Sequence, residues 1–142
     1  MCGICGVINI KHEKIPAVVS IVNTMNDLIA HRGPDGEGTW IHQDGMLGFG
    51  HRRLSIIDLQ TGDQPMIDDR GNWIVYNGEV YNYIELRKEL GQEKFTTTSD
   101  TEVILRAYQK WGDDCVQHFR GMFSFVIWDE HNRAESITTF CE

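Results

Sequence analysis

The sequence has no long hydrophobic run, very little proline and fewer basic than acidic residues. Proline accounts for 3 of the 142 residues, and no window reaches the apolar length of a membrane-spanning helix. The N-terminal segment MCGICGVINI lacks the basic start and the long apolar stretch of a secretory signal peptide. We therefore expect a cytoplasmic protein without a membrane anchor.

The charge balance bears on the class of partner. The chain carries 13 Lys and Arg against 21 Asp and Glu, which gives a formal net charge of −8. Such an acidic chain is poorly suited to the phosphate backbone of nucleic acid, although a local basic pocket is compatible with it. The length fits one hydrophobic core, so residues 1–142 are predicted to form one domain.

The few cysteines do not indicate a disulfide framework, because thiols stay reduced in the cytosol. Cys2 and Cys5 form a C-x-x-C pair, which is typical of redox sites or of half a zinc site. A thioredoxin-type pair opens a helix, whereas this pair leads into strand-like residues, and no second metal-type pair occurs. Redox and zinc functions are the less favoured alternatives, and Cys5 is expected to be a small buried residue.

Hydrophobic periodicity and turn residues predict strands and helices that are grouped in blocks. The expected strands are 4–10, 38–43, 46–57, 64–68, 73–76, 122–128 and 137–140, and the expected helices are 16–31, 81–91, 99–112 and 113–119. Asp44-Gly45 is the kind of dipeptide that closes a tight hairpin. Because the order is not a regular βαβ alternation, a largely antiparallel α+β sandwich is favoured over a doubly wound sheet.

Several residues mark helix ends. Pro16 suits the first position of a helix, and Ser99 with Glu102 three residues later forms a capping-box pattern. Gly91 and Gly112 are expected to end two helices, since glycine accepts the backbone conformation that follows a last turn. The helix between Ser99 and Gly112 is therefore predicted with well-defined ends.

Cys2 is the first candidate for chemistry. Removal of Met1 would leave a thiol and a free α-amine on one residue, with ordinary pKa values of about 8.5 and about 8. The amine could then act as the base for the nucleophile of its own residue. The alternative is that Cys2 has no chemical role, and its position alone favours that alternative.

Six motifs in order carry a resemblance to a known family. They read MCGICGV, HRGPDGEG, HRRLSIID, YNGEVYNY, TTSDTEVIL and RGMFSFVIWD, and they extend from Cys2 to about Arg133. This order resembles the glutaminase domain of class II glutamine amidotransferases, which are N-terminal-nucleophile hydrolases. The form of the motifs looks most like the asparagine synthetase branch. The resemblance implies a four-layer αββα sandwich of mostly antiparallel sheets.

The resemblance also implies a reaction. Cys2 would attack the side-chain amide of glutamine, release ammonia and leave a γ-glutamyl thioester that water hydrolyses to glutamate. The Asn77 side-chain amide and the Gly78 backbone N–H would stabilise the negative oxygen of the tetrahedral intermediate. The alternative for Asn77-Gly78 is an ordinary tight turn, which would be preferred without the surrounding YNGEVYN.

The charged ends of glutamine need oppositely charged partners. By resemblance Arg53 binds the α-carboxylate and Asp100 binds the α-ammonium. Arg52 should face the other side of its strand, and Asp100 has helix capping as a competing role. The other contacts implied with the substrate are backbone groups of Leu54, Ser55, Ile56, Ile57 and Glu79. The residues to which we assign only structural roles are His31, Arg32 and Asp35.

Two departures from the family limit these expectations. In the family an ARD-x-x-G-x-KPLY-like stretch follows the WD turn, whereas residues 134–142 read AESITTFCE, so the domain is expected to be incomplete at its C-terminus. No SGGxDS pyrophosphate loop is present. ATP and Mg²⁺ are therefore expected only in a separate synthetase domain, and no cofactor or metal in this one.

These departures leave alternatives open. The expected partners are L-glutamine, an ammonia-accepting synthetase domain or subunit, and a second copy of the chain in a homo-oligomer. An inactive glutaminase-like fragment that only binds glutamine is the main alternative to an active glutaminase. A redox or zinc protein is the third possibility, and it would depend on Cys5 as much as on Cys2.

Overall fold

The computed structural model describes residues 2–54, 62–132 and 137–141, with the main chain alone for the last of these ranges. The described chain divides into two compact units. The first unit contains Met1–Ser55 with Asp63–Pro65, and the second contains Ile56–Gly62 with Met66–Glu142. No helix in the described ranges has both the length and the apolar character needed to span a membrane.

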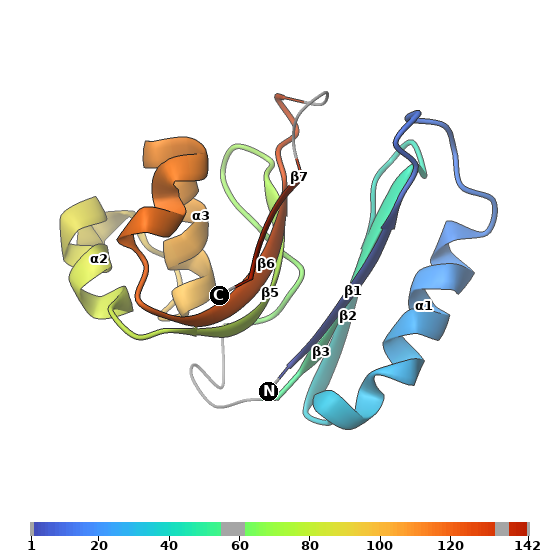
Figure 1. The fold of residues 1–142 in the computed structure, drawn as a ribbon, viewed down its shortest axis with the longest axis horizontal. Coiled ribbons are helices and arrows are strands. Elements are labelled where there is room, and N and C mark those ends of the chain that lie inside the picture. Colours follow the sequence, from blue (N-terminus) through green and yellow to red (C-terminus); the bar gives the residue numbers. More distant parts are fainter. Residues whose placement is uncertain (1, 55–61, 133–136, 142) are drawn as a thin grey trace. The chain divides into compact units, whose positions relative to one another are not determined.

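The first unit is a three-stranded antiparallel sheet with one helix (Figure 1). Its strands β1 (Gly3–Ile8), β2 (Gly36–Ile41) and β3 (Leu47–Arg53) lie in the order β1-β3-β2. Helix α1 (Val18–Leu28) covers one face of this sheet. The predicted hairpin at Asp44-Gly45 is confirmed, with β2 and β3 paired on either side of it.

Glycine and asparagine form much of the contact between α1 and the sheet. A Cβ on Gly48 would lie 2.7 Å from Val22 Cγ2, and a Cβ on Gly50 would lie 2.6 Å from Asn26 Oδ1. The buried Asn26 side chain donates hydrogen bonds to Gly38 O at 3.0 Å and to Thr39 Oγ1 at 3.3 Å. The helix therefore approaches the sheet closely and is held by hydrogen bonds.

The predicted start of α1 is wrong by two residues. Ala17 has φ 55°, which lies outside the helical region, so the helix begins at Val18 and cannot include Pro16. The first hydrogen bond of the helix runs from Ile21 N to Ala17 O at 3.1 Å. Beyond Leu28 the chain continues as the 3₁₀ helix η1 (Ala30–Arg32), which leads into the glycine-rich loop.

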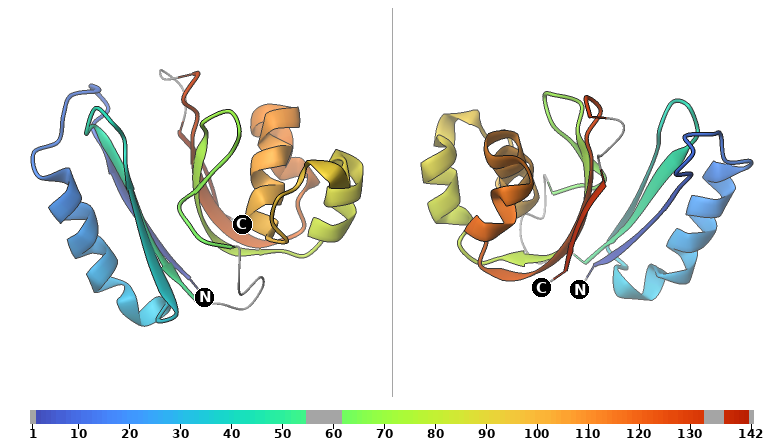
Figure 2. Two further views of the ribbon diagram at one scale, coloured as in Figure 1. Left: turned by 180° about the vertical axis from the view of Figure 1, so that it is seen from behind. Right: turned by 45° about the horizontal axis from the view of Figure 1, so that its top comes forward.

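The second unit is a four-stranded antiparallel sheet with α2 (Tyr83–Leu90) and α3 (Asp100–Trp111) on one face (Figure 2). Its strands are β4 (Met66–Ile67), β5 (Trp73–Val80), β6 (Gly121–Trp128) and β7 (Ile137–Cys141), in that order. Two 3₁₀ helices, η2 (Gln92–Lys94) and η3 (Gly112–His118), follow α2 and α3. The buried core of this unit contains Ile74, Tyr76, Val80, Leu86, Leu90, Val103, Ile104, Leu105, Ala107, Cys115, Phe119, Phe123, Phe125 and Ile127.

Strand β5 runs further than expected and includes Asn77-Gly78, so the alternative of a tight turn is wrong. Asn77 pairs with Ser124 and Gly78 with Phe123 of the neighbouring strand β6. Gly78 has φ 149°, and a Cβ there would lie 2.2 Å from Met122 O. Glycine is required because β6 approaches this point of β5 too closely for any side chain.

The predicted ends of α3 are confirmed, with one difference in detail. Ser99 Oγ accepts a hydrogen bond from Thr101 N at 3.1 Å, and Gly112 follows the last turn with φ 60°. Glu102 does not return to Ser99 as in a standard capping box. Its carboxylate accepts the backbone N–H groups of Thr96 at 3.0 Å and Thr97 at 2.7 Å.

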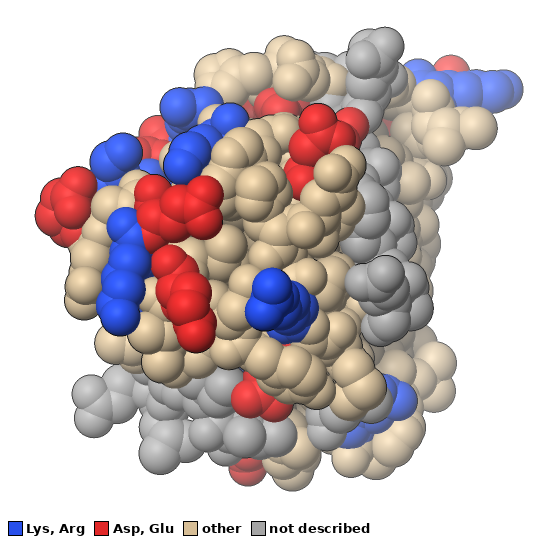
Figure 3. Space-filling model, turned by 60° about the vertical axis from the view of Figure 1, so that its left-hand side comes forward, with Lys and Arg blue, Asp and Glu red and all other residues tan. Residues whose placement is uncertain are grey.

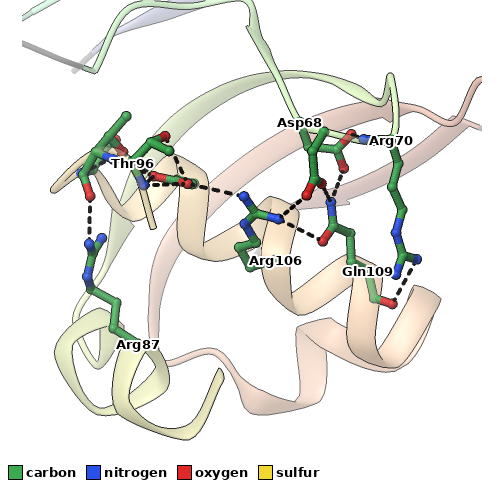
Figure 4. A network of polar contacts seen from close by, with 10 residues as sticks. Asp68, Arg70, Arg87, Thr96, Arg106 and Gln109 are labelled. Carbon is green, nitrogen blue, oxygen red and sulfur yellow. Dashed lines mark hydrogen bonds and ion pairs between the residues drawn. The ribbon is translucent and has the colours of Figure 1, made fainter. Parts of the chain in front are cut away.

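A polar network continues along α3 (Figure 4). Arg106 lies 3.7 Å from Glu102 and donates to Asp69 Oδ2 at 2.9 Å, while Gln109 Nε2 donates to Asp68 Oδ2 at 2.7 Å. The network joins the loop before α3 to the turn between β4 and β5. Each unit thus has one helical layer on one antiparallel sheet, which confirms the expected α+β class.

Candidate functional site

Cys2 lies directly before β1, against the end of β3. The register pairs Gly3 with Arg52, which brings the residue before Gly3 beside the residues that follow Arg52. The Cys2 thiol donates to Leu54 O at 3.6 Å, and Leu54 N donates to Cys2 Sγ at 3.3 Å. The half-buried sulfur is therefore held by both backbone groups of the residue next to Arg53.

The loop after α1 also supports this position. Arg32 Nε donates to Cys2 O at 3.1 Å. A Cβ on the adjacent Gly33 would lie 2.3 Å from the carbonyl carbon of Arg52, so this loop runs directly against the main chain of β3. The structural role expected for Arg32 is thus a contact with the main chain of Cys2 itself.

Arg52 and Arg53 have different partners, as the alternation of a strand requires. Arg52 binds Asp27 of α1 at 2.8 Å and Glu37 of β2, within the sheet and helix of this unit. Arg53 pairs with Asp63 at 2.9 Å, and the Asp63 side chain is 90% exposed. The Asp63 carboxylate is a partner of Arg53 that a ligand could replace at low cost.

Cys5 lies on the opposite face of the sheet from Cys2. Its sulfur is 3.5 Å from Asn26 Oδ1 under α1, whereas the Cys2 sulfur contacts Leu54. Burial raises the pKa of the Cys5 thiol, and the residue is half-buried where full burial was expected. Two thiols on opposite faces do not form a dithiol site. Among the described residues no group of three or more His, Cys, Asp or Glu could hold a metal ion.

In the second unit, Asn77, Gly78 and Glu79 are consecutive residues of β5. Asn77 Oδ1 is buried and has no hydrogen-bond partner among the described residues. Glu79 is exposed and lies opposite Met122. The three residues that resemblance assigns to the oxyanion and to the substrate therefore share one strand segment.

Asp100 is buried at the first turn of α3 and is bonded to the same strand. Asp100 Oδ2 accepts hydrogen bonds from Tyr76 Oη at 2.6 Å and from Val80 N at 3.1 Å. Its side chain is not the helix cap, because Ser99 has that role. The competing interpretation of Asp100 as a capping residue is therefore wrong, although a carboxylate at a helix N-terminus is still favoured electrostatically.

Tyr76 is a residue that the sequence analysis missed. Burial and the neighbouring Asp100 carboxylate raise the pKa of the Tyr76 hydroxyl far above its usual range, so it remains a proton donor. Its place in the YNG motif gave no signal of a polar contact, because the partner lies 24 residues away. Only the fold brings the two groups together.

The predicted site residues thus occupy two sets. Cys2, Arg53 and Leu54 are together in the first unit, and Asn77, Gly78, Glu79 and Asp100 are together in the second. Ser55, Ile56 and Ile57 lie outside the described residues. On the face drawn in Figure 3, basic side chains are interspersed with acidic ones, and no continuous basic surface is seen among the described residues there.

Comparison with solved structures defines the class of fold. The chain is similar to glutamine phosphoribosylpyrophosphate amidotransferase from Bacillus subtilis, with a TM-score of 0.68 over 92% of this chain and 35% of that one. The two sequences are 19% identical, so this likeness concerns the fold alone. It confirms the expected fold class, an α+β fold with mostly antiparallel sheets.

Sequence comparison then identifies the family. Residues 1–138 match the model of the glutamine amidotransferase domain, and the chain belongs to that family. It is 46% identical to glutamine-hydrolysing asparagine synthetase 1 and 42% identical to synthetase 3 of Bacillus subtilis, over 93% and 92% of this chain. It spans about a fifth of these relatives, 21% and 22% of their lengths. The expected resemblance to asparagine synthetases is confirmed.

Proposed function

We propose that this domain hydrolyses L-glutamine to glutamate and ammonia with Cys2 as the nucleophile. The observation that supports it best is the position of the Cys2 thiol, which both backbone groups of Leu54 hold beside Arg53. A thiol at the second residue, an arginine that directly precedes the residue holding this thiol, and membership of the glutamine amidotransferase domain family all suit one substrate.

The proposed reaction has two steps. Cys2 Sγ attacks the amide carbon of glutamine while the α-amine of Cys2, exposed once Met1 is removed, accepts the thiol proton and passes it to the leaving nitrogen. The carbon–nitrogen bond breaks and ammonia leaves a γ-glutamyl thioester. Water then attacks this thioester, the carbon–sulfur bond breaks, and glutamate leaves with the thiol restored.

Charge stabilisation in both steps is assigned to the second unit. Asn77 Nδ2 and the Gly78 backbone N–H are the proposed donors to the tetrahedral oxygen. Asn77 Oδ1 is buried and accepts no hydrogen bond from the described residues. No step of this proposal uses a metal or a cofactor.

Recognition of the substrate is assigned to two charged residues. Arg53 would bind the α-carboxylate in place of the exposed Asp63, and Asp100 would bind the α-ammonium. Backbone groups of Leu54, Ser55, Ile56, Ile57 and Glu79 remain the other proposed contacts.

The ammonia needs an acceptor. The relatives named above are asparagine synthetases, and a further relative, amidase chry2 of Gibberella zeae, is 42% identical over 94% of this chain and 22% of its own length. We propose that the ammonia serves an asparagine-synthetase-type reaction in the cytoplasm, on a synthetase domain or subunit that supplies its own ATP and Mg²⁺. A homo-oligomer remains a prediction.

Ammonia release from glutamine at neutral pH tests the proposal, together with the intact mass of the chain. Removal of Met1 and release of ammonia are expected, and Cys2→Ala should lower the rate by about 10⁴-fold or more, because nothing replaces the nucleophile. Cys5→Ala is the matched control, since Cys5 faces α1, and it should keep most of the activity.

Two results would contradict the proposal. Equal losses of activity in Cys2→Ala and Cys5→Ala would favour a redox or zinc site that uses both cysteines. Binding of glutamine without any ammonia release, by a chain that lacks Met1 and unfolds cooperatively, would favour a binding module.

A further inference from the structure

The hydrogen bond between Tyr76 and Asp100 is short and buried. Tyr76 Oη lies 2.6 Å from Asp100 Oδ2, and the two residues are 3% and 6% exposed. A charge-assisted bond of this kind, away from water, holds its partners in a fixed orientation more strongly than a bond between neutral groups.

The hydrogen bonds to Asp100 enclose the part of β5 that contains the residues assigned to the oxyanion and to the substrate. Tyr76 and Val80 N both donate to Asp100 Oδ2, and Asn77, Gly78 and Glu79 lie between them on β5. Asp100 therefore ties the first turn of α3 to both ends of this segment.

One oxygen of Asp100 is left for other use. Tyr76 Oη and Val80 N both donate to Oδ2, and Oδ1 accepts no hydrogen bond from any residue in the described ranges. Because burial and the nearby carboxylate raise the pKa of the Tyr76 hydroxyl, Tyr76 stays a donor at neutral pH and Oδ2 stays occupied. A carboxylate held by one oxygen presents the other in a defined direction.

We infer that Tyr76 is a positioning residue for glutamine recognition, which orients Asp100 so that Oδ1 receives the α-ammonium group of the substrate. This inference rests on the proposed function, in which Asp100 binds that group. Tyr76 itself touches no reacting atom in this assignment. Its effect should therefore depend on whether the substrate carries an α-ammonium.

Two substrates separate this role from a structural one. L-Glutamine and glutaramic acid have the same side-chain amide and the same carboxylate, but glutaramic acid lacks the α-ammonium. Tyr76→Phe removes only the hydroxyl, and it should raise KM for L-glutamine by about tenfold with kcat changed by less than about threefold. With glutaramic acid kcat/KM should be the same in both proteins.

A second tyrosine–aspartate pair in the same unit provides the matched control. Tyr108 Oη donates to Asp129 Oδ2 at 3.1 Å near the other end of α3. Tyr108→Phe also removes one hydroxyl from an aspartate, and it should leave KM for L-glutamine unchanged. Thermal unfolding of both variants shows whether either change disturbs the fold.

Asp100→Asn tests whether Tyr76 acts through Asp100. The amide lacks the charge that attracts an ammonium, so this variant should lose more activity with L-glutamine than with glutaramic acid. Adding Tyr76→Phe to Asp100→Asn should then have little further effect, because two residues that act as one unit are not additive.

The outcomes distinguish the inference from the proposed function. An unchanged KM in Tyr76→Phe, or equal losses with both substrates, would overturn the inference while ammonia release by the parent chain upheld the proposed function. If the parent chain binds glutamine without turnover, the same comparison of Tyr76→Phe is made on Kd, with the same expected tenfold increase. A parent chain that neither binds nor hydrolyses glutamine would overturn both.

Discussion

The two units join helix to sheet in different ways. In the first unit α1 lies over Gly48 and Gly50, and the buried Asn26 hydrogen-bonds to β2. In the second unit α2 and α3 pack through aliphatic and aromatic side chains such as Ile104 and Phe125. The first arrangement defines position through close approach and directed bonds, whereas the second stabilises through apolar burial.

The charged site residues show the same contrast. Arg53 of the first unit pairs with a carboxylate that is 90% exposed, and water already competes for that partner. Asp100 of the second unit is buried and bonded to Tyr76 and Val80. A ligand could displace the partner of Arg53, but it must use the oxygen of Asp100 that the fold leaves open.

The largest effect is expected from Phe125→Ala, which opens a cavity in the apolar core of the second unit. Phe125 is 0% exposed, and the change should lower the free energy of unfolding by about 4 kcal/mol. Met122→Ala, on the same strand but 61% exposed, is the control and should cost little. Urea unfolding measures the free energy of unfolding of each variant, and hydrogen exchange shows which of the two units is destabilised. If Phe125→Ala accelerated hydrogen exchange more in α1 than in α3, the second unit would not be the one that this apolar core stabilises.

Gly50→Ala should cause the second-largest loss of stability, and the loss should arise in the first unit. The added methyl would lie 2.6 Å from both Asn26 Oδ1 and Cys5 Sγ, so these packed side chains must shift, at a cost of about 3 kcal/mol. Gly36→Ala is the control, because its nearest contact is an ordinary 3.6 Å from Arg53 Cβ. Equal stability of the two variants in urea would show that α1 does not depend on this close approach.

Glu102→Gln should destabilise the second unit by about 2 kcal/mol, since the buried carboxylate accepts N–H groups from Thr96 and Thr97. Burial opposes its ionisation, but these hydrogen bonds hold the pKa below its ordinary value of 4.5.

The sign of the pH dependence follows from that direction. The stabilisation is complete above pH 4.5 and is lost as the pH falls through the folded-state pKa. Urea midpoints of the parent chain should therefore fall below pH 4.5, and those of Glu102→Gln should fall less. The exposed Glu89→Gln should behave like the parent. If the urea midpoints of Glu102→Gln and of the parent fell equally as the pH was lowered, another group would be responsible for the loss of stability in acid.

The smallest effect is expected from Arg52→Gln. Arg52 joins Asp27 to Glu37, whose side chains are 77% and 65% exposed, and such pairs contribute about 1 kcal/mol or less. The loss should shrink further in high salt, because exposed charges are screened. A loss of several kcal/mol that salt does not change would show that the first unit depends on buried charge as the second does.

Local signals in the sequence predicted most of the elements. Asp44-Gly45, Ser99 and Gly112 each act within a few residues of themselves, so the hairpin and both ends of α3 were predictable. Pro16 and Asn77-Gly78 were not, because each pattern is also found in a different local structure. For Asn77-Gly78 the choice depends on pairing with Ser124 and Phe123, more than 40 residues away.

The candidate site divides in the same way. Cys2, Arg53, Asn77, Gly78 and Asp100 were named from motifs alone, and the structure gives each of them a defined place. The hydrogen bonds from Leu54 and Arg32 to Cys2 were not foreseen, since they join residues 52 and 30 positions apart. No pattern within one segment records such contacts.

The sequence by itself determined both ends of α3, the hairpin at Asp44-Gly45, the family and the identity of the chemical groups, because these follow from short-range backbone preferences and ordered motifs. Only the tertiary structure decided which partners Arg52 and Arg53 have, that Gly78 lies against β6, and that Asp100 is held by Tyr76. Those outcomes depend on which strands pair and which helix covers them. The free energy that selects that pairing comes from residues far apart in the chain.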